Sequence, residues 1–221
     1  TCALPICILH LEGADSIGND EEILYLFYRL GLRSLGLTWN NRNLLADGVG
    51  EEPGGGGISR KGREIIKLMD SLGIILDLSH ISVRSYYEAM EIYSKPVLVS
   101  HANARALCNH CRNLDDHQLK ALASNGGVIG INQVLEFVKE DGNPSINDLL
   151  DHLVYITELI GIEHVALGSD FDGDDVLVMP GVEEYSKWPN LLSSRGFTAK
   201  ETALILQGNA LRVLKAVLPH S

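Results

Sequence analysis

Two short apolar runs, each ending in a Ser-His pair, constrain the fold of this 221-residue chain more than any other feature. Residues 73–80 read GIILDLSH, and residues 96–101 read PVLVSH. Runs of this length that are rich in branched residues and bounded by Gly or Pro are typical of strands buried on both faces. Each run therefore predicts a strand with a histidine at its carboxyl end.

The histidines at these two strand ends, His80 and His101, are candidate metal ligands. In parallel α/β folds the carboxyl ends of the strands meet at one edge of the sheet, where such folds carry their chemistry. A single histidine there is more often a core residue bonded to a backbone carbonyl. Because these two occupy equivalent positions in successive units, we expect them to point into the same space, as ligands of a shared metal ion do.

The pattern of a strand followed by a helix occurs six times. Alternation of this kind, without hairpin signals, predicts a parallel sheet that is closed or open. A (β/α)8 barrel needs two more units and usually ~250 residues. We therefore predict an α/β fold, a TIM-type (β/α)8 metal-dependent hydrolase barrel with about six of its eight units present, in which residues 1–221 form a single domain that lacks the N-terminal strands. Strands are expected at 6–11, 33–38, 73–80, 96–101, 126–131 and 164–168, and helices at 20–30, 60–72, 84–94, 115–124, 147–160 and 198–217, the last split near Gly208.

The charge of the chain limits its partners. A formal charge of -11 and a pI of about 5.1 argue against nucleic acid or an anionic membrane as the main partner. No run approaches ~18 apolar residues and no basic leader precedes the first apolar run, so neither a membrane span nor a signal peptide is expected. The chain begins with Thr1 and enters an apolar run at once, as a fragment does, and we expect sequence upstream of it.

The pair Cys108 and Cys111 has the CxxC spacing of a zinc knuckle or redox motif. A structural zinc site needs four ligands, and no second CxxC pair exists in the sequence. Two reduced thiols in a loop are the favoured interpretation. Reduced thiols suit a cytoplasmic location, which is the one we predict.

Two carboxylates join the histidines at predicted strand ends. Glu12 follows the first apolar run, and Asp170 follows the last. Taken alone, Glu12 is more readily interpreted as a solvated loop acid. Carboxylate and imidazole ligands together suit zinc, which lowers the pKa of a bound water to ~7 and so favours hydrolysis. The residues alone thus predict a metal-dependent α/β hydrolase.

Seven stretches also carry a resemblance to a known family. They occur in the family's order and cover nearly the whole chain. At these residues the chain resembles the membrane (renal-type) dipeptidases, peptidase family M19, and especially their bacterial homologues, which are peptidases of the amidohydrolase-like barrel class. The stretches are LEGAD at 11–15, GLRSLGLTWN at 31–40, DLSH at 77–80, SHANAR at 100–105, CRN at 111–113, GGVIGIN at 126–132 and GSDFDG at 168–173.

The resemblance implies a role for each candidate residue. Glu12 would bridge two Zn2+ ions, and His80 and His101 would complete the ligands of the second ion. Asp170 would hold the amino group of the substrate or handle the proton during hydrolysis. Arg112 would pair with the terminal carboxylate of the substrate, for which a bidentate guanidinium is well suited; the alternative is a solvated loop charge. A site that binds both the free amine and the free carboxylate of the substrate would account for specificity for dipeptides. The protein could also form a homodimer.

Two departures from the family leave alternatives open. Family members carry a His-x-Asp pair on the first barrel strand that binds the first zinc, and no such pair lies upstream of Glu12 here. Trp39 stands where the kidney-type enzymes place a histidine. Zinc-dependent hydrolysis of dipeptides is the predicted function, and the alternatives are hydrolysis of another small amide or lactone, or an inactive barrel used for binding.

Overall fold

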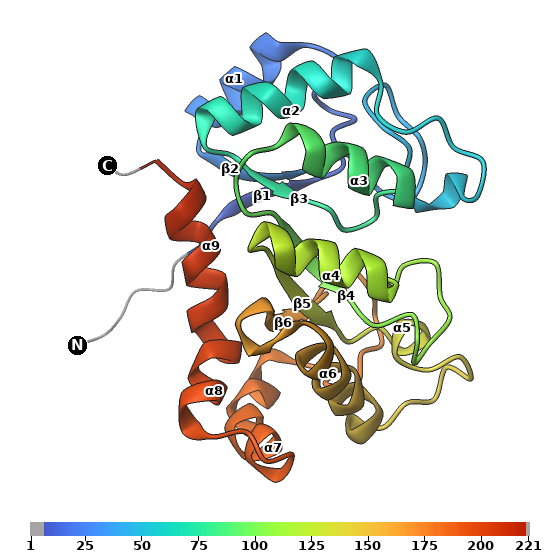
Figure 1. Ribbon diagram of the computed structural model, residues 1–221, viewed down its shortest axis with the longest axis vertical. Helices are drawn as coiled ribbons and strands as arrows, with labels where there is room; N and C mark the ends of the chain where they lie inside the picture. The colour runs from blue at the N-terminus through green and yellow to red at the C-terminus, as the bar shows by residue number, and fades with distance from the viewer. Residues whose placement is uncertain (1–6, 220–221) are drawn as a thin grey trace. The chain divides into compact units, whose positions relative to one another are not determined.

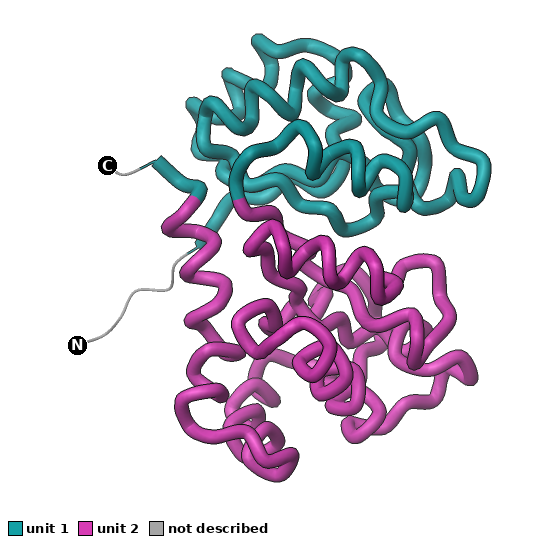
Figure 2. Tube along the Cα trace, in the orientation of Figure 1, with its two compact units in different colours: residues 1–95, 217–221 teal, residues 96–216 magenta. Residues whose placement is uncertain are grey.

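The computed structural model describes residues 7–219. The chain divides into two compact units, residues 1–95 with 217–221 (unit 1) and residues 96–216 (unit 2), which Figure 2 shows in different colours. Each unit contains three strands that pair in parallel (Figure 1). The predicted parallel α/β fold, in which six strands alternate with helices, is confirmed. The single-domain prediction stays a prediction.

Unit 1 is built on the strand order β1-β2-β3. The register pairs Glu12 with Gly36 and Gly36 with Asp77, so the three strands end level with one another. Helix α1 packs against β2, and α2 packs against β3. The elements are β1 (Leu9–Glu12), α1 (Glu21–Arg29), β2 (Leu32–Gly36), the 3-10 turn η1 (Val49–Glu51), α2 (Arg60–Leu72), β3 (Ile75–Asp77) and α3 (Val83–Ile92).

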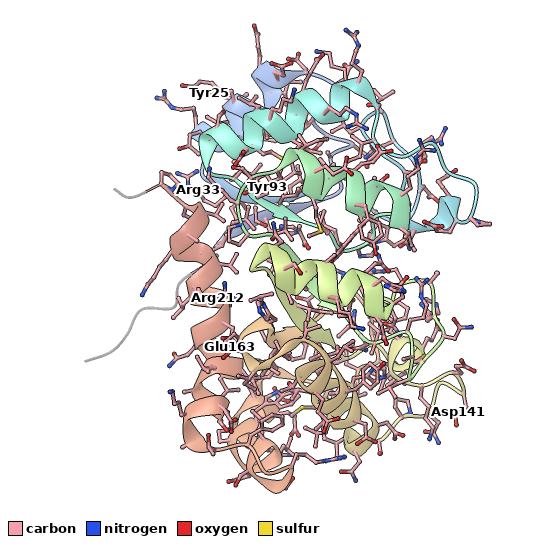
Figure 3. The ribbon with its side chains drawn as sticks, in the orientation of Figure 1. Tyr25, Arg33, Tyr93, Asp141, Glu163 and Arg212 are labelled. Carbon is pink, nitrogen blue, oxygen red and sulfur yellow. The ribbon has the colours of Figure 1, made fainter. Side chains whose placement is uncertain are left out.

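Local sequence determines where these helices begin and end. The predicted cap of α2 is confirmed, because the side chain of Ser59 accepts a hydrogen bond from the backbone N–H of Gly62. The same helix ends at Gly73, whose φ of 70° is a left-handed conformation that favours glycine. Asp20 and Ser82 cap α1 and α3 in the same way. The buried Tyr93, labelled in Figure 3, donates its hydroxyl to the carbonyl of Ile74 at 2.8 Å, just before β3.

Unit 2 has the strand order β4-β5-β6. Gly130 and Gly168 lie on adjacent strands, and a Cβ at either position would come within 2.2 Å of the carbonyl oxygen of Ser100 on β4. Only glycine permits this close approach of the three strands. The elements are β4 (Leu98–Ala102), α4 (Asp116–Asn125), β5 (Val128–Asn132), α5 (Leu135–Val138), α6 (Ile146–Ile160), η2 (Ile162–His164), β6 (Val165–Ser169), η3 (Val182–Lys187), α7 (Trp188–Ser194), α8 (Ala199–Ala203), the π-helical segment η4 (Leu204–Gly208) and α9 (Asn209–Val217).

The C-terminal helical region differs in detail from the prediction. The expected split near Gly208 is a π-helical segment that joins α8 to α9, and it widens the helix without ending it. Arg212 on α9 donates to the backbone carbonyls of Gly126 and Glu163, at 2.6 and 2.9 Å; the side chains of Arg212 and Glu163 are labelled in Figure 3. Between residues 7 and 219, no helix has both the length and the apolar character needed to cross a membrane.

Candidate metal and substrate site

Unit 1 brings Glu12 and His80 together. Glu12 is the last residue of β1, and Gly13 turns the chain there with a φ of 84°. His80 follows β3, and its Nε2 lies 3.0 Å from Oε1 of Glu12. The imidazole is almost completely buried, whereas the Glu12 side chain is 41% exposed. Two strand ends thus supply one imidazole and one carboxylate that face each other.

The backbone of His80 adopts a conformation that is unusual for a residue with a side chain. Its φ of 64° lies in the left-handed region, which costs free energy for any residue other than glycine. The carbonyl oxygen of His80 accepts hydrogen bonds from the backbone N–H of Val49 at 2.8 Å and from the hydroxyl of Thr38 at 3.4 Å. These contacts hold the strained residue, so the direction of its side chain is fixed by the loop that packs on it.

The other nitrogen of the His80 ring also has a fixed partner. Nδ1 lies 2.8 Å from the side-chain amide oxygen of Asn40, and the ring of Trp39 lies 5.9 Å from the imidazole, centroid to centroid. An amide oxygen only accepts hydrogen bonds, so Nδ1 donates to it, and a neutral ring in this arrangement has its lone pair on Nε2, facing Glu12. A lone pair directed at a carboxylate is the arrangement a divalent metal requires, and the donor set therefore fits a metal ion.

A second cluster of polar side chains, His10, Ser34 and Asp77, lies on the three strands of unit 1. The sequence analysis did not predict this cluster. His10 Nδ1 lies 2.9 Å from the hydroxyl of Ser34, and its Nε2 lies 3.5 Å from Oδ2 of Asp77. Asp77 is buried and also accepts a hydrogen bond from the backbone N–H of Ser79. These residues connect β1, β2 and β3 through their side chains, and alternation along β1 places His10 on the same face as Glu12.

Unit 2 brings His101 and Asp170 together. His101, on β4, has its Nδ1 2.8 Å from the hydroxyl of Ser100 and its Nε2 3.9 Å from Oδ2 of Asp170. Asp170 follows β6 with a φ of 74°, and the side-chain N–H of Asn132 donates to its Oδ2 at 3.0 Å. The amide of Asn132 is itself oriented, because its oxygen accepts from the backbone N–H of Val134 at 2.6 Å. Asn132, at the end of β5, is a partner that sequence reasoning did not assign.

Arg112 is buried although it stands in a loop. The residue is only 5% exposed, its Nη2 donates to the backbone carbonyl of His101 at 3.4 Å, and its guanidinium carbon lies 5.6 Å from the centre of the Phe137 ring. Burial excludes the alternative of a solvated loop charge. The neighbouring side chains of Asn103 and Asn113 both donate to the carbonyl of Phe137, at 3.2 and 2.8 Å, and so fix the segment on which Arg112 packs.

Two other histidines of unit 2, His110 and His152, have their pKa lowered by burial. Burial lowers the pKa of His110, whose ring stacks on Phe137 with centroids 4.5 Å apart. Burial also lowers the pKa of His152, which accepts from the N–H of Ala104 at Nδ1 and lies 2.9 Å from the carbonyl of Val138 at Nε2. His152 is buried and His110 is partly buried, and these contacts join both of them to the backbone or to an aromatic ring of the surrounding fold.

The CxxC cysteines are both free thiols. Cys108 is buried, and its thiol donates to the carbonyl of Glu136 at 3.2 Å. Burial raises the pKa of this thiol, so it stays protonated and unreactive. Cys111 is exposed. Among residues 7–219 the cysteines join no group of ligands that could hold a metal ion.

Parallel strands that end in imidazole and carboxylate side chains are typical of metal-dependent hydrolases of the α/β barrel class. Residues 5–220 match the family model described as membrane dipeptidase, peptidase family M19. The chain belongs to this family, as the sequence resemblance predicted.

Individual relatives support the same assignment. Dipeptidase tcpJ of Claviceps purpurea (strain 20.1) is 35% identical over 215 residues, which cover 95% of this chain and 50% of the relative. Dipeptidase aclJ of Aspergillus oryzae is 38% identical over 213 residues, covering 94% and 50%. A metallopeptidase from Rhodobacter sphaeroides, solved with a phosphinate mimic of the dipeptide L-Ala-D-Ala, has a TM-score of 0.90 and 30% identity, covering 95% of this chain and 63% of that one. The chain thus spans about half the length of the two curated dipeptidases.

Proposed function

We propose that the protein hydrolyses dipeptides with the help of bound Zn2+, two ions in the full-length gene product. The observation that carries this proposal is the facing pair of His80 Nε2 and Glu12 Oε1, 3.0 Å apart, with the ring oriented by Asn40. We further propose that His101 joins Glu12 and His80 as a ligand. Metal ions held by these side chains supply a Lewis acid that polarises the scissile carbonyl and makes water a stronger nucleophile.

The protein's own residues would bind and orient the substrate. Arg112 is a buried cation that contacts a backbone carbonyl and an aromatic ring. A free carboxylate is the natural partner for such a guanidinium, because two parallel charge-assisted hydrogen bonds form. Asp170, held by Asn132, can accept a hydrogen bond from an ammonium group or take up a proton during hydrolysis. Together these two groups recognise a substrate with a free amine and a free carboxylate.

The comparisons support a dipeptide as that substrate. The family is described as membrane dipeptidase, and the similar structure from Rhodobacter sphaeroides was solved with a mimic of L-Ala-D-Ala. A substrate with only two residues is one whose amine and carboxylate both lie close to the scissile bond. We therefore expect dipeptides to be hydrolysed and longer peptides to be rejected.

The test uses the full-length gene product and four substrates: Ala-Ala with either configuration at the second residue, its C-terminal amide, and tri-alanine. Dipeptide hydrolysis should disappear on treatment with a chelator and return with Zn2+. His101→Ala should abolish turnover of every substrate, because a ligand is lost. His117→Ala is the matched control, since this histidine is exposed on α4, and it should retain full activity.

Three outcomes would contradict the proposal. A zinc-loaded protein that cleaves small amides or lactones but no dipeptide would support the alternative hydrolase. A protein that binds zinc and cleaves nothing would support a binding role. Full activity of the His101→Ala variant would remove that residue from the metal site.

A further inference from the structure

We infer that Asn40 is the positioning residue of His80: its side-chain oxygen accepts from Nδ1, so that Nε2, the nitrogen that faces Glu12, is the one that can bind a metal ion. The inference rests on the proposed metal site. It gives a function to a residue outside the proposed set of metal ligands. Asn40 comes to His80 from the loop after β2, whereas His80 itself follows β3.

The first support is the hydrogen bond itself. A separation of 2.8 Å between Nδ1 of His80 and Oδ1 of Asn40 is a good hydrogen-bond distance. Glu12 Oε1 lies 3.0 Å from the opposite ring nitrogen, Nε2. Contacts at both nitrogens therefore fix the orientation of the ring. Without an acceptor at Nδ1, the neutral ring could place its proton on Nε2 and donate it to Glu12, and that tautomer cannot bind a metal through Nε2.

The second support is that one loop holds both the ring and the backbone of His80. The carbonyl of Asn40 accepts from the N–H of Gly50 at 2.7 Å, and the adjacent N–H of Val49 donates to the carbonyl of His80. A Cβ at Gly48 would lie 2.3 Å from the Asn40 carbonyl oxygen, so the two parts of the loop pack directly on each other. Asn40 therefore sits on a supported backbone, as a residue that orients a ligand must.

The third support is the chemistry of an amide in this position. Glu12 already provides a negative charge to His80. A neutral amide oxygen fixes the tautomer without adding a second carboxylate to the same imidazole. Partners of this kind commonly change metal affinity by ~10- to 100-fold when removed, although they never contact the metal.

The experiment measures zinc affinity of the full-length gene product by competition with a chromogenic chelator. Asn40→Leu keeps the approximate size of the side chain and removes the acceptor, and it should raise the zinc dissociation constant by ~10- to 100-fold. Asn40→Asp retains an acceptor oxygen and should bind zinc more tightly than Asn40→Leu. Asn41→Ala, at the exposed neighbouring position, is the matched control and should bind zinc normally.

The outcomes separate this inference from the proposed function. If the unaltered protein binds zinc and Asn40→Leu binds it equally well, Asn40 does not position His80 and the metal site stands. If the unaltered protein binds no zinc, the proposed function falls and the inference falls with it. Because Asn40→Leu could also disturb folding, nitrogen-15 spectra of labelled histidine provide a second test on the zinc-loaded unaltered protein. They should show the His80 proton on Nδ1, and a proton on Nε2 would overturn the inference.

Discussion

The guanidinium of Arg112 contacts a backbone carbonyl and an aromatic ring within a buried loop. A guanidinium presents parallel N–H donors that match the two oxygens of a carboxylate. The nearby Arg105 has different partners, since it donates to the carbonyls of Asn113 and Cys111, both at 3.0 Å. Two arginines of one loop thus differ in their surroundings, since Arg112 lies against the Phe137 ring.

Removing each of these arginines should give different kinetic patterns. Arg112→Ala should cost most for dipeptides with a free carboxylate and least for dipeptide amides, because a charge-assisted pair worth ~1.5 to 3 kcal/mol, or about one to two decades in kcat/KM, is lost only for the acids. Arg105→Ala should lower kcat/KM equally for acid and amide substrates, because it removes hydrogen bonds to the loop backbone that do not involve the substrate. Equal losses on acid and amide for Arg112→Ala would show that Arg112 is structural.

At this scale the sequence predicted the charged and imidazole residues but not their partners. The resemblance placed Glu12 and His80 at one site, and they face each other. Asn40 and Asn132 were not assigned, because asparagine after a strand is equally common in turns. Only the structure shows that each amide is directed at a candidate site residue, and that Arg112 is buried.

Helix α6 carries a histidine that links it to two other segments. His152 bonds to the backbone at Ala104, after β4, and at Val138, the last residue of α5. Burial lowers its pKa and outweighs the opposite effect of Asp148 and Asp151 on the same helix. Protonation would remove the acceptor that Ala104 uses.

The stability of the protein should therefore fall in acid partly because of His152. An unfolded histidine titrates near pH ~6.5, and the folded one titrates lower, so the unfolded state takes up the proton first. The stability that this histidine contributes is present above pH ~6.5 and is lost as pH falls through the window down to its folded pKa. Urea unfolding between pH 5 and 8 should show a shallower decline for His152→Gln than for the unaltered protein. The control His117→Ala should leave the dependence of the free energy of unfolding on pH unchanged. If His152→Gln also leaves it unchanged, other groups cause the loss of stability in acid.

The close approach of β4, β5 and β6 predicts that a side chain at Gly130 would destabilise the protein. Gly130→Ala would place a methyl group against the Ser100 carbonyl, a backbone atom that cannot rotate away, and should destabilise the protein by ~1 to 3 kcal/mol in urea unfolding. Gly54→Ala is the control, because no atom lies within 4 Å of a Cβ there, and its effect should be close to zero. An unchanged free energy of unfolding in the Gly130→Ala variant would mean that the strands move apart at little cost.

Elements with a strong periodic pattern were predicted well, and weakly patterned ones were not. Helix α2 matches its predicted range of 60–72, because Ser59 and Gly73 signal both ends. Strand β3 is shorter than predicted at both ends: Gly73 and Ile74 precede it, and Leu78 leads into the turn in which His80 has a positive φ. Helix α7 was not predicted, because a short helix that contains Pro has too few residues to show a helical repeat of apolar positions. The π-helical segment was not predicted, because one extra residue per turn hardly alters that repeat.

At the scale of the whole molecule, unit 1 has an apolar surface along β1 and α1. Leu9, Leu26 and Leu30 are 55%, 54% and 68% exposed. A cavity of about 250 Å³ lies beside them, lined by Leu9, His10, Leu11, Phe27, Leu30 and Leu32. Within the described part of unit 1, β2 is the strand that pairs with β1. An open strand edge beside exposed leucines favours association.

The 221-residue chain should consequently self-associate when it is produced alone. Light scattering at rising concentration should show aggregates, and Leu30→Lys should reduce them by adding charge to the surface. Leu107→Lys, at an exposed leucine of unit 2, is the control and should have little effect. A monomeric chain that melts cooperatively would show that this surface is tolerated.

Trp39 gives the protein a built-in optical signal. Its indole is 51% exposed and lies 5.9 Å from the His80 ring, whereas Trp188, in unit 2, is buried. Fluorescence from an indole depends on the charge of an imidazole this close. Titration with Zn2+ should therefore change the emission in step with metal occupancy, and Trp39→Phe should abolish that change. Loading of the site could then be followed in real time without any added dye.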